Sequence, residues 1–371
     1  MIELTAIGVS IIAGFGPMLF YSFLLYRLDR YEKEPFITLA AVYCWGAVIA
    51  AGGAFLINTI SSLGLSFVFQ SESTAMFTTM TLVAPVVEEA LKGFAVLLVY
   101  LFFQQEFDSR LDGILFAGVT ALGFAATENA WYIYSLGYLP GGWKGFLDLF
   151  IIRTLWVGWQ HPFYTAFIGL GLAQFRLSPG LRNRWIFPVL GFSAAIFLHT
   201  LHNLLAVFLS EPPGYLFSRA WDWTGYLGLL IFIFGVNQRE KRWIKKYLAE
   251  EVEKNTLTKS QLSSLMRTST QLAEIRKQPS RETRKQVKRF FHLAGELMHK
   301  KRQKAERIKN KNKEANIDYL RSEVRKLSRQ ISMSDIPKSL PTRIIKEHPD
   351  EQPAGRISLA PGKDEQPDLR N

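Results

Sequence analysis

Cysteine and several common catalytic motifs are scarce or missing in this sequence. Cys44 is the single cysteine, so an intramolecular disulfide and a thiolate metal site are both excluded. No Walker A loop, dinucleotide fingerprint, Gly-x-Ser-x-Gly elbow or His-Glu-x-x-His motif occurs. Nucleotide chemistry, serine-elbow hydrolysis and the water-soluble zincin pattern therefore have no support in the sequence.

Charge is also scarce, but only in the first two thirds of the chain. Up to Asn237 there are 11 Lys and Arg against 14 Asp and Glu, whereas 33 and 18 follow, within a net charge of +12. A basic block beside apolar segments is typical of a cytoplasmic region that contacts anionic lipid. Because no nucleic-acid-binding motif accompanies the charge, we expect no nucleic acid partner.

Long apolar segments fill the part that is poor in charge. Each has about 20–28 residues, enough to cross the hydrocarbon core of a bilayer. The first segment lacks a basic n-region and is expected to be retained as a span. The predicted spans are 4–26, 36–60, 76–103, 111–135, 150–175, 185–209 and 217–236, with 145–158 as an alternative interfacial helix.

The predicted fold is all-α, a polytopic membrane helix bundle of about seven spans with a basic cytoplasmic helical tail. The expected divisions are a transmembrane domain at 1–236, a basic helical region at 237–335 and a disordered tail at 336–371. Helices are expected in the tail region at 239–254, 259–277 and 282–310, with Ser280 as a cap of the last.

The loops predict the orientation in the membrane. Basic residues follow the first, fifth and seventh spans, and the alternate loops 61–75, 136–149 and 210–216 contain almost none. The positive-inside rule then places the N-terminus outside and the C-terminus in the cytoplasm. The basic residues used are Arg27, Arg30, Lys33, Arg176, Arg182, Arg184, Arg239, Lys241, Arg242, Lys245 and Lys246.

Three glutamates and three histidines lie inside these spans. A charged group at mid-membrane costs roughly 2.5–3.5 kcal/mol, so such residues face one another, a metal or a water-filled cavity. Span positions put them at about the same depth in the outer half of the bilayer, which indicates a common site. The residues are Glu88, Glu89, Glu128, His161, His199 and His202.

The motif Glu88-Glu89-Ala90-Leu91-Lys92 suits acid–base chemistry. On a helix, Lys92 is four residues from Glu88 and three from Glu89, so it can neutralise one carboxylate. The other carboxylate is then a candidate base that takes a proton from water. The alternative is a structural ion pair. Pro85 lies three residues before this motif and is expected to interrupt the helical hydrogen bonds there, which frees backbone groups nearby.

Histidines on two later spans supply candidate metal ligands. Either His161 or His199 could bind Zn²⁺, or could hold water and stabilise an oxyanion. The candidate metal set is His161, His199 and Glu128, and the supporting residues are Lys92, Asn203 and His202. The alternatives are histidines that are hydrogen-bonded in the core and a Glu128 that faces lipid headgroups.

These motifs together resemble the PrsW family of polytopic membrane proteases, which are distantly related to the CAAX prenyl endopeptidases. The resemblance covers about residues 10–236, and its segments are Asp29–Pro35, Ala84–Lys92, Asp112–Ile114, Gly123–Asn129, His161 and His199-x-x-x-Asn203. It implies endoproteolysis of membrane-anchored proteins, including an anti-sigma factor cut on its extracytoplasmic side. The catalytic residues it implies are Glu88, Glu89, Glu128, His161 and His199, whereas His202 matches no family position.

Two other classes of function remain open at this stage. Intramembrane Glu and His also build the proton relays of ion-coupled transporters, although no repeated halves are evident. A non-enzymatic scaffold would suit the basic tail. We expect a membrane endopeptidase that uses intramembrane proteolysis, with Zn²⁺ as the candidate cofactor.

Overall fold

The computed structural model describes residues 2–28, 34–107, 109–178, 180–211, 213–305 and 313–331. Within these ranges the regular elements are helices, without a β-strand, which confirms the predicted all-α class there. Segment 29–33 of the predicted motif and the tail predicted at 336–371 lie outside the described residues.

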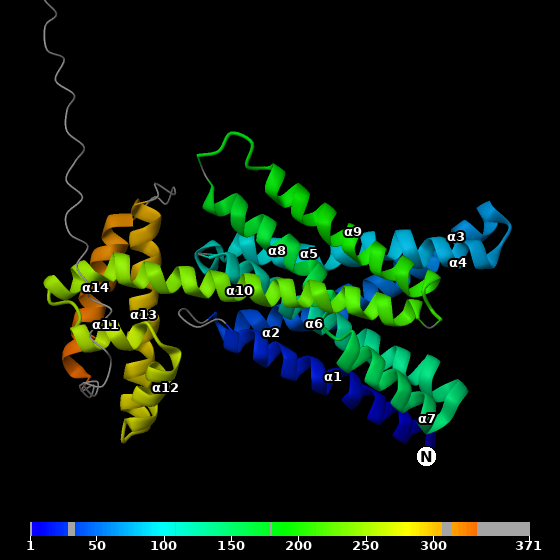
Figure 1. The fold of residues 1–371 in the computed structure, drawn as a ribbon, viewed down its shortest axis with the longest axis horizontal. Coiled ribbons are helices and arrows are strands. Elements are labelled where there is room, and N and C mark those ends of the chain that lie inside the picture. Colours follow the sequence, from blue (N-terminus) through cyan, green and yellow to red (C-terminus); the bar gives the residue numbers. More distant parts are fainter. Residues whose placement is uncertain are drawn as a thin grey trace, which may run out of the picture. The chain divides into compact units, whose positions relative to one another are not determined.

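Helices form most of the described apolar part, together with four short π-helical segments (η1, η2, η4 and η5) and one 3₁₀ turn (η3). Their bounds are α1 (Ile2–Leu28), α2 (Phe36–Cys44), η1 (Trp45–Ala50), α3 (Ala51–Phe69), α4 (Glu72–Thr78), η2 (Thr79–Val83), α5 (Ala84–Phe102), η3 (Gln104–Glu106), α6 (Arg110–Tyr132), η4 (Ile133–Tyr138), α7 (Leu139–Phe150), η5 (Ile151–Trp156), α8 (Gln160–Leu177) and α9 (Ile186–Phe208). In Figure 1, α6 lies among α1, α2, α5 and α8.

Helix α6 is the centre of this bundle and is buried along nearly its whole length. Small residues allow the close contacts. A Cβ on Gly113 would overlap the backbone of Gly169 on α8, and a Cβ on Gly123 would overlap the carbonyl oxygen of Tyr43 on α2. This close approach at small residues brings Glu128, on the same helix, near side chains from other helices.

Four helical segments of the described residues are long and apolar enough to cross a membrane, at Glu3–Leu28, Phe36–Phe69, Arg110–Leu177 and Ile186–Phe208. The third of these contains two predicted spans, 111–135 and 150–175. The predicted span 76–103, which contains Glu88, Glu89 and Lys92, is not among the four. The exact number of seven spans therefore stays a prediction.

The region before α8 differs from the predicted fifth span. Helix α7 and η5 occupy 139–156, and α8 begins only at Gln160. This arrangement agrees with the alternative of a separate short helix over 145–158. Pro162 lies in the first turn of α8, where a missing N–H costs no helical hydrogen bond.

Helix α10 (Gly214–Glu253) runs without a break through the predicted domain boundary at residue 236. Its second half contacts α11 (Lys259–Leu265) and α13 (Arg281–Ala305), as Figure 1 shows. Helices α12 (Thr268–Lys277) and α14 (Lys313–Gln330) complete this group, and α14 was not expected.

The tail helices share an apolar core of their own. Ile244 and Leu248 of α10 pack with Phe290 and Leu297 of α13 and with Leu320 of α14. Leu265 of α11 belongs to the same core, so α13 also packs with the preceding short helix. Ser280 accepts a hydrogen bond from the Thr283 N–H at 3.0 Å and caps α13 as predicted.

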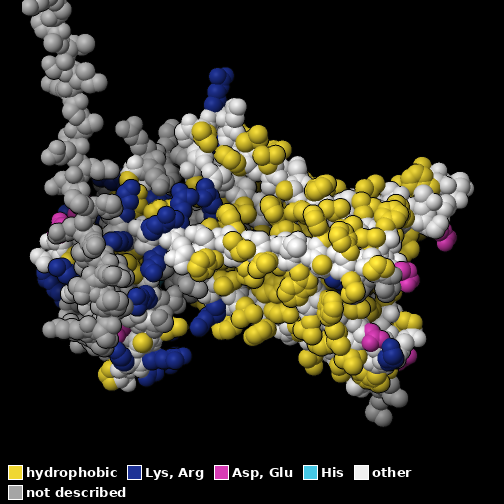
Figure 2. Space-filling model, in the orientation of Figure 1, with side chains coloured by type: hydrophobic (Ala, Val, Ile, Leu, Met, Phe, Trp, Pro, Cys, Tyr) yellow, Lys and Arg dark blue, Asp and Glu magenta, His cyan; other side chains and the backbone are white. Residues whose placement is uncertain are grey.

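The surface of the apolar part is hydrophobic. Large side chains such as Ile12, Phe20, Phe197 and Ile231 are exposed there, which suits contact with lipid. Figure 2 shows hydrophobic side chains over these helices and Lys and Arg side chains over the tail helices.

Candidate active site

Helix α5 presents both acids of the Glu-Glu motif and its lysine to the interior. Lys92 is fully buried, and its Nζ lies 2.6 Å from Glu89 Oε1 but 4.0 Å from Glu88 Oε2. The lysine therefore neutralises mainly Glu89, as the spacing allowed, and leaves Glu88 less engaged. Residues from other helices also bind Glu89 and so make the surroundings of the two carboxylates different.

Three groups hold Glu89. Besides Lys92, the Thr165 hydroxyl of α8 donates to Glu89 Oε2 at 2.8 Å, and His199 Nδ1 of α9 lies 3.0 Å from Oε1. A carboxylate only accepts hydrogen bonds, so Nδ1 of His199 carries the proton and Nε2 has a free lone pair. Glu89 thus fixes the tautomer and the orientation of His199.

His161 lies between a cation and an anion. Its Nδ1 is 3.2 Å from Lys92 Nζ, and its Nε2 is 2.8 Å from Glu128 Oε2. An ammonium group only donates, so Nδ1 accepts and Nε2–H donates to Glu128. His161 is therefore neutral with both ring nitrogens in use.

Arg153 of η5 neutralises Glu128. One guanidinium nitrogen forms an ion pair with Glu128 Oε2, and Nε donates to the side-chain oxygen of Asn129 at 2.8 Å. The side chain of Glu128 is 19% exposed, so it borders a space that solvent can enter. The predicted lipid-facing alternative for Glu128 does not agree with these contacts.

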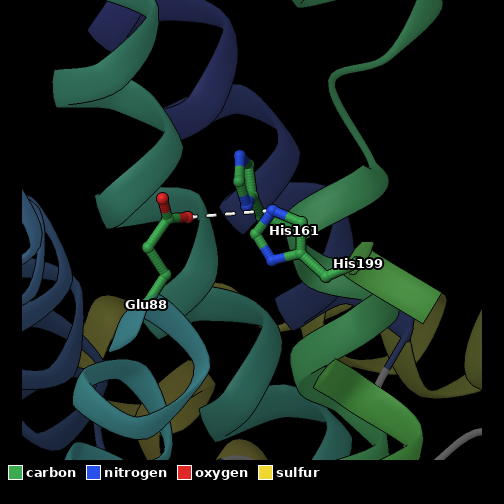
Figure 3. A group of neighbouring side chains, drawn as sticks. All are labelled: Glu88, His161 and His199. Carbon is green, nitrogen blue, oxygen red and sulfur yellow. Dashed lines mark ion pairs between the residues drawn. The ribbon is translucent and has the colours of Figure 1, made fainter. Parts of the chain in front are cut away.

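Glu88, His161 and His199 form a group that could hold a metal ion. One ligand atom from each lies within 4.8 Å of the others, and all three residues are buried. Figure 3 shows the Glu88 carboxylate directed at the His199 ring, where Oε2 is 3.8 Å from Nε2. This group contains Glu88 in the place of Glu128, which was the carboxylate in the predicted metal set.

The donor set fits a divalent ion on two observations. Glu88 Oε2 is buried and has no hydrogen-bond partner within the described ranges, and the lone pair of His199 Nε2 faces it. Two histidines and a carboxylate are a common ligand set for Zn²⁺. The His161 Nδ1 lone pair now accepts a hydrogen bond from the Lys92 ammonium. A bound ion would take the place of Lys92 at this nitrogen.

His202 belongs to a second polar group beside the first. It lies 3.0 Å from Asp222 Oδ1 of α10, and Gln160 Nε2 donates to Asp222 Oδ2 at 3.0 Å. Arg219 also pairs with Asp222, at 3.3 Å. Asp222 and Arg219 lie in the predicted span 217–236, and a charged residue inside a span indicates a functional or paired group. Neither residue was assigned a role from the sequence.

Asn203 supports the entry to α5. Ala84 N–H bonds the Thr79 carbonyl in the π-helical pattern of η2, and the next bond would need an N–H that Pro85 lacks. Asn203 Nδ2 donates to the Met80 carbonyl at 2.8 Å. Pro85 thus opens the helix as predicted, and Asn203 ties α9 to the opening.

A cavity of about 810 Å³ adjoins both polar groups. Its polar wall contains Glu88, Glu128, His161, His199 and His202. Its other walls are mainly apolar and come from α3, α6, η5 and α9. Lining residues there include Ala54, Phe55, Trp131, Ile152 and Val207. A polypeptide segment with apolar side chains could therefore lie against the buried acids and histidines.

An apolar helix bundle with a buried Glu/His site that borders a cavity suits the class of membrane-embedded hydrolases. A family model described as "PrsW family intramembrane metalloprotease" matches residues 34–236, and the chain belongs to that family. It is a peptidase and a membrane protein. No solved structure matches the chain.

Several curated relatives share the name "Protease PrsW". The chain is 34% identical to the protein of Clostridioides difficile over 120 residues, which are 32% of this chain and 48% of that relative. It is 27% identical to the Geobacillus kaustophilus protein over 57% of this chain and 87% of that relative. For the Bacillus subtilis protein, identity is 24% over 62% of this chain and 93% of that relative. These matches do not favour the transporter or scaffold alternatives.

Proposed function

We propose that this protein hydrolyses peptide bonds of membrane-anchored proteins in the cavity beside Glu88. The observation that carries this proposal is the buried group of Glu88, His161 and His199 at the cavity wall. Its acid and imidazole groups are of the types that activate water. The apolar lining suits a substrate segment that comes from the bilayer.

The metal would be held by Glu88, His199 Nε2 and His161. Zn²⁺ in such a site supplies a water of lowered pKa and polarises the substrate carbonyl. Glu89 keeps the Nε2 lone pair of His199 directed at the site, through the hydrogen bond to Nδ1. Lys92 balances the charge of Glu89.

Glu128 is the carboxylate proposed to move the proton. It lines the cavity, is partly exposed and contacts His161. Its carboxylate takes a proton from the attacking water and returns it to the departing amide nitrogen. Arg153 holds Glu128 in place through their ion pair. Glu88 and Glu128 therefore have separate roles, and Glu89 a positioning role.

The proposed topology has seven spans, with the N-terminus outside and the cytoplasmic region beginning after residue 236. The intramembrane acids would then lie in the outer half of the bilayer and cut on the extracytoplasmic side. A membrane-anchored regulator of the anti-sigma-factor type is the proposed substrate. Exposed basic residues of α10, namely Arg239, Arg242, Lys245 and Lys246, are proposed to contact anionic lipid.

The experiment compares purified wild type with the Glu88→Gln variant in lipid vesicles that contain candidate single-span proteins. Wild type is expected to produce a defined fragment and to contain about one zinc per chain, whereas Glu88→Gln should do neither. Gln keeps the size of Glu but loses the negative charge that binds a cation. Equal cleavage by both proteins would contradict the proposal. Cleavage by wild type that persists after complete removal of metal would reject the zinc role alone.

A further inference from the structure

Tyr164 is a buried residue of the cavity wall to which no role has been given so far. It lies on α8, three residues after His161, and is 3% exposed. Its ring stacks on the ring of His199, with centroids 5.0 Å apart and planes at 22°. The centroid of the His161 ring is 6.4 Å away. Tyr164 thus contacts His199 and lies near His161.

The hydroxyl of Tyr164 has no hydrogen-bond partner within the described part of the chain. A buried hydroxyl without a partner costs stability, so such a group in a native protein needs an explanation. Tyr164 also lines the cavity, where a bound substrate could accept its hydrogen bond. A purely structural role of the ring in stacking on His199 would not need the oxygen.

Four polar donors of the cavity wall that carry charge or an amide are already engaged, whereas Asn58 of α3 is a lining amide without such a contact in the described part of the chain. Arg153 binds Glu128 and Asn129, Arg219 binds Asp222, and Asn203 binds the Met80 carbonyl. Gln160 donates to Asp222. Each of these donors would have to break an existing bond to bind a substrate oxygen, whereas Tyr164 would not.

We propose that the Tyr164 hydroxyl donates a hydrogen bond to the substrate carbonyl oxygen as it becomes an oxyanion. This inference rests on the proposed function. When the water oxygen bonds to the carbonyl carbon, the π electron pair moves onto the carbonyl oxygen and the water proton goes to Glu128. The hydroxyl keeps its own proton and stabilises the new negative charge. A donor of this kind contributes most in the transition state, where the charge develops.

The test is Tyr164→Phe, which keeps the ring and its stacking on His199 but removes the oxygen. We expect kcat to fall by about 10²- to 10³-fold with KM nearly unchanged, as for the loss of one oxyanion donor. Zinc content should stay at the wild-type level. The unfolding temperature should be equal or higher, because the variant no longer buries an unpaired hydroxyl.

Tyr226→Phe is the matched control. Tyr226 is also buried and its hydroxyl is also unpartnered within the described ranges, but it does not line the cavity. This variant should keep full activity. Thr79→Val tests the rival donor, because the Thr79 hydroxyl has no hydrogen-bond partner among the described residues and Thr79 lines the cavity. A large loss of kcat in Thr79→Val with none in Tyr164→Phe would assign the role to Thr79 and overturn the inference.

Glu88→Gln separates failure of this inference from failure of the proposed function. If Glu88→Gln is inactive and Tyr164→Phe is fully active, the site is correct and the Tyr164 role is wrong. If Glu88→Gln is active, the proposed function itself fails. A Tyr164→Phe protein that unfolds at a lower temperature would show that the hydroxyl has a structural partner, which also overturns the inference.

Discussion

Glu89 and His199 are 110 residues apart in the chain, yet Glu89 Oε1 lies 3.0 Å from His199 Nδ1. The contact joins α5 to α9 and leaves His199 Nε2 facing Glu88. Because Lys92 and Thr165 also bind Glu89, the adjacent acids of the Glu-Glu motif have different surroundings. Glu89 is enclosed by donors, and Glu88 is directed at the metal-binding group. Substitutions at the two positions should therefore have different consequences.

Loss of the Glu89 charge should destabilise the fold. In Glu89→Gln the buried Lys92 ammonium loses its closest anionic partner, and breaking a buried ion pair costs about 3–5 kcal/mol. We expect a clearly lower unfolding temperature for purified protein in detergent. The double variant Glu89→Gln/Lys92→Met should recover part of this loss, because it removes the unpaired charge. A double variant no more stable than the single one would contradict the ion-pair explanation.

Glu88 and Glu128 should separate metal binding from proton transfer. We expect Glu88→Gln to lose both zinc and cleavage, since it removes a proposed ligand. Glu128→Gln should retain zinc but lose about 10²- to 10⁴-fold in kcat, the usual range for a general acid–base group. Elemental analysis and initial rates on the same samples test both statements. Loss of zinc in Glu128→Gln would restore Glu128 to the metal set expected from the sequence.

The sequence predicted a common site for Glu88, Glu89, Glu128, His161 and His199, but not how their side chains pair. The spacing of Glu88, Glu89 and Lys92 already placed one lysine beside two acids. The spacing alone left open which acid Lys92 neutralises, because Thr165 and His199 make that choice from α8 and α9. The Arg153–Glu128 pair likewise depends on the packing of η5 against α6.

Element boundaries were least predictable where local pattern and tertiary packing differ. Apolar residues predominate on both sides of Gln160 within 139–177, so hydropathy alone does not reveal the helix break before it. Helix α10 was divided at residue 236 because its composition changes there, whereas its backbone continues to Glu253. The sequence of α14 is highly charged, so its packing was not predicted. In the structure, Leu320 and Val324 of α14 belong to the core of the tail helices.

The orientation of the chain can be tested with reporters at two positions. Since basic residues follow the first, fifth and seventh predicted spans, a reporter fused after Lys246 should be cytoplasmic. A reporter inserted in the loop 61–75 should lie outside and serves as the control. A reporter at Lys246 found outside would invert the proposed topology and move the cut to the cytoplasmic side.

Lowering the pH should destabilise the packing of the tail helices, because it protonates Glu251. This residue lies beyond the predicted last span. Burial raises the pKa of this carboxyl, but hydrogen bonds from Arg321, Lys301 and Thr256 outweigh it and lower the pKa to about 2. A lowered folded-state pKa gives stability that is fully present above the unfolded value near 4.5 and is lost as the pH falls toward 2. The contribution at neutral pH is about 1–3 kcal/mol.

Hydrogen exchange of tail amides in the full-length protein measures this effect. Protection of α13 and α14, corrected for the intrinsic pH dependence of exchange, should fall between about pH 4.5 and pH 2. In Glu251→Gln, protection should already be lower at pH 7 and should change less over that range, because Gln does not titrate. Glu250→Gln is the matched control, since Glu250 is 52% exposed and its ion pairs with Lys254 and Lys301 are screened by solvent. Equal pH dependence in wild type and Glu251→Gln would show that another group controls the acid response of the tail.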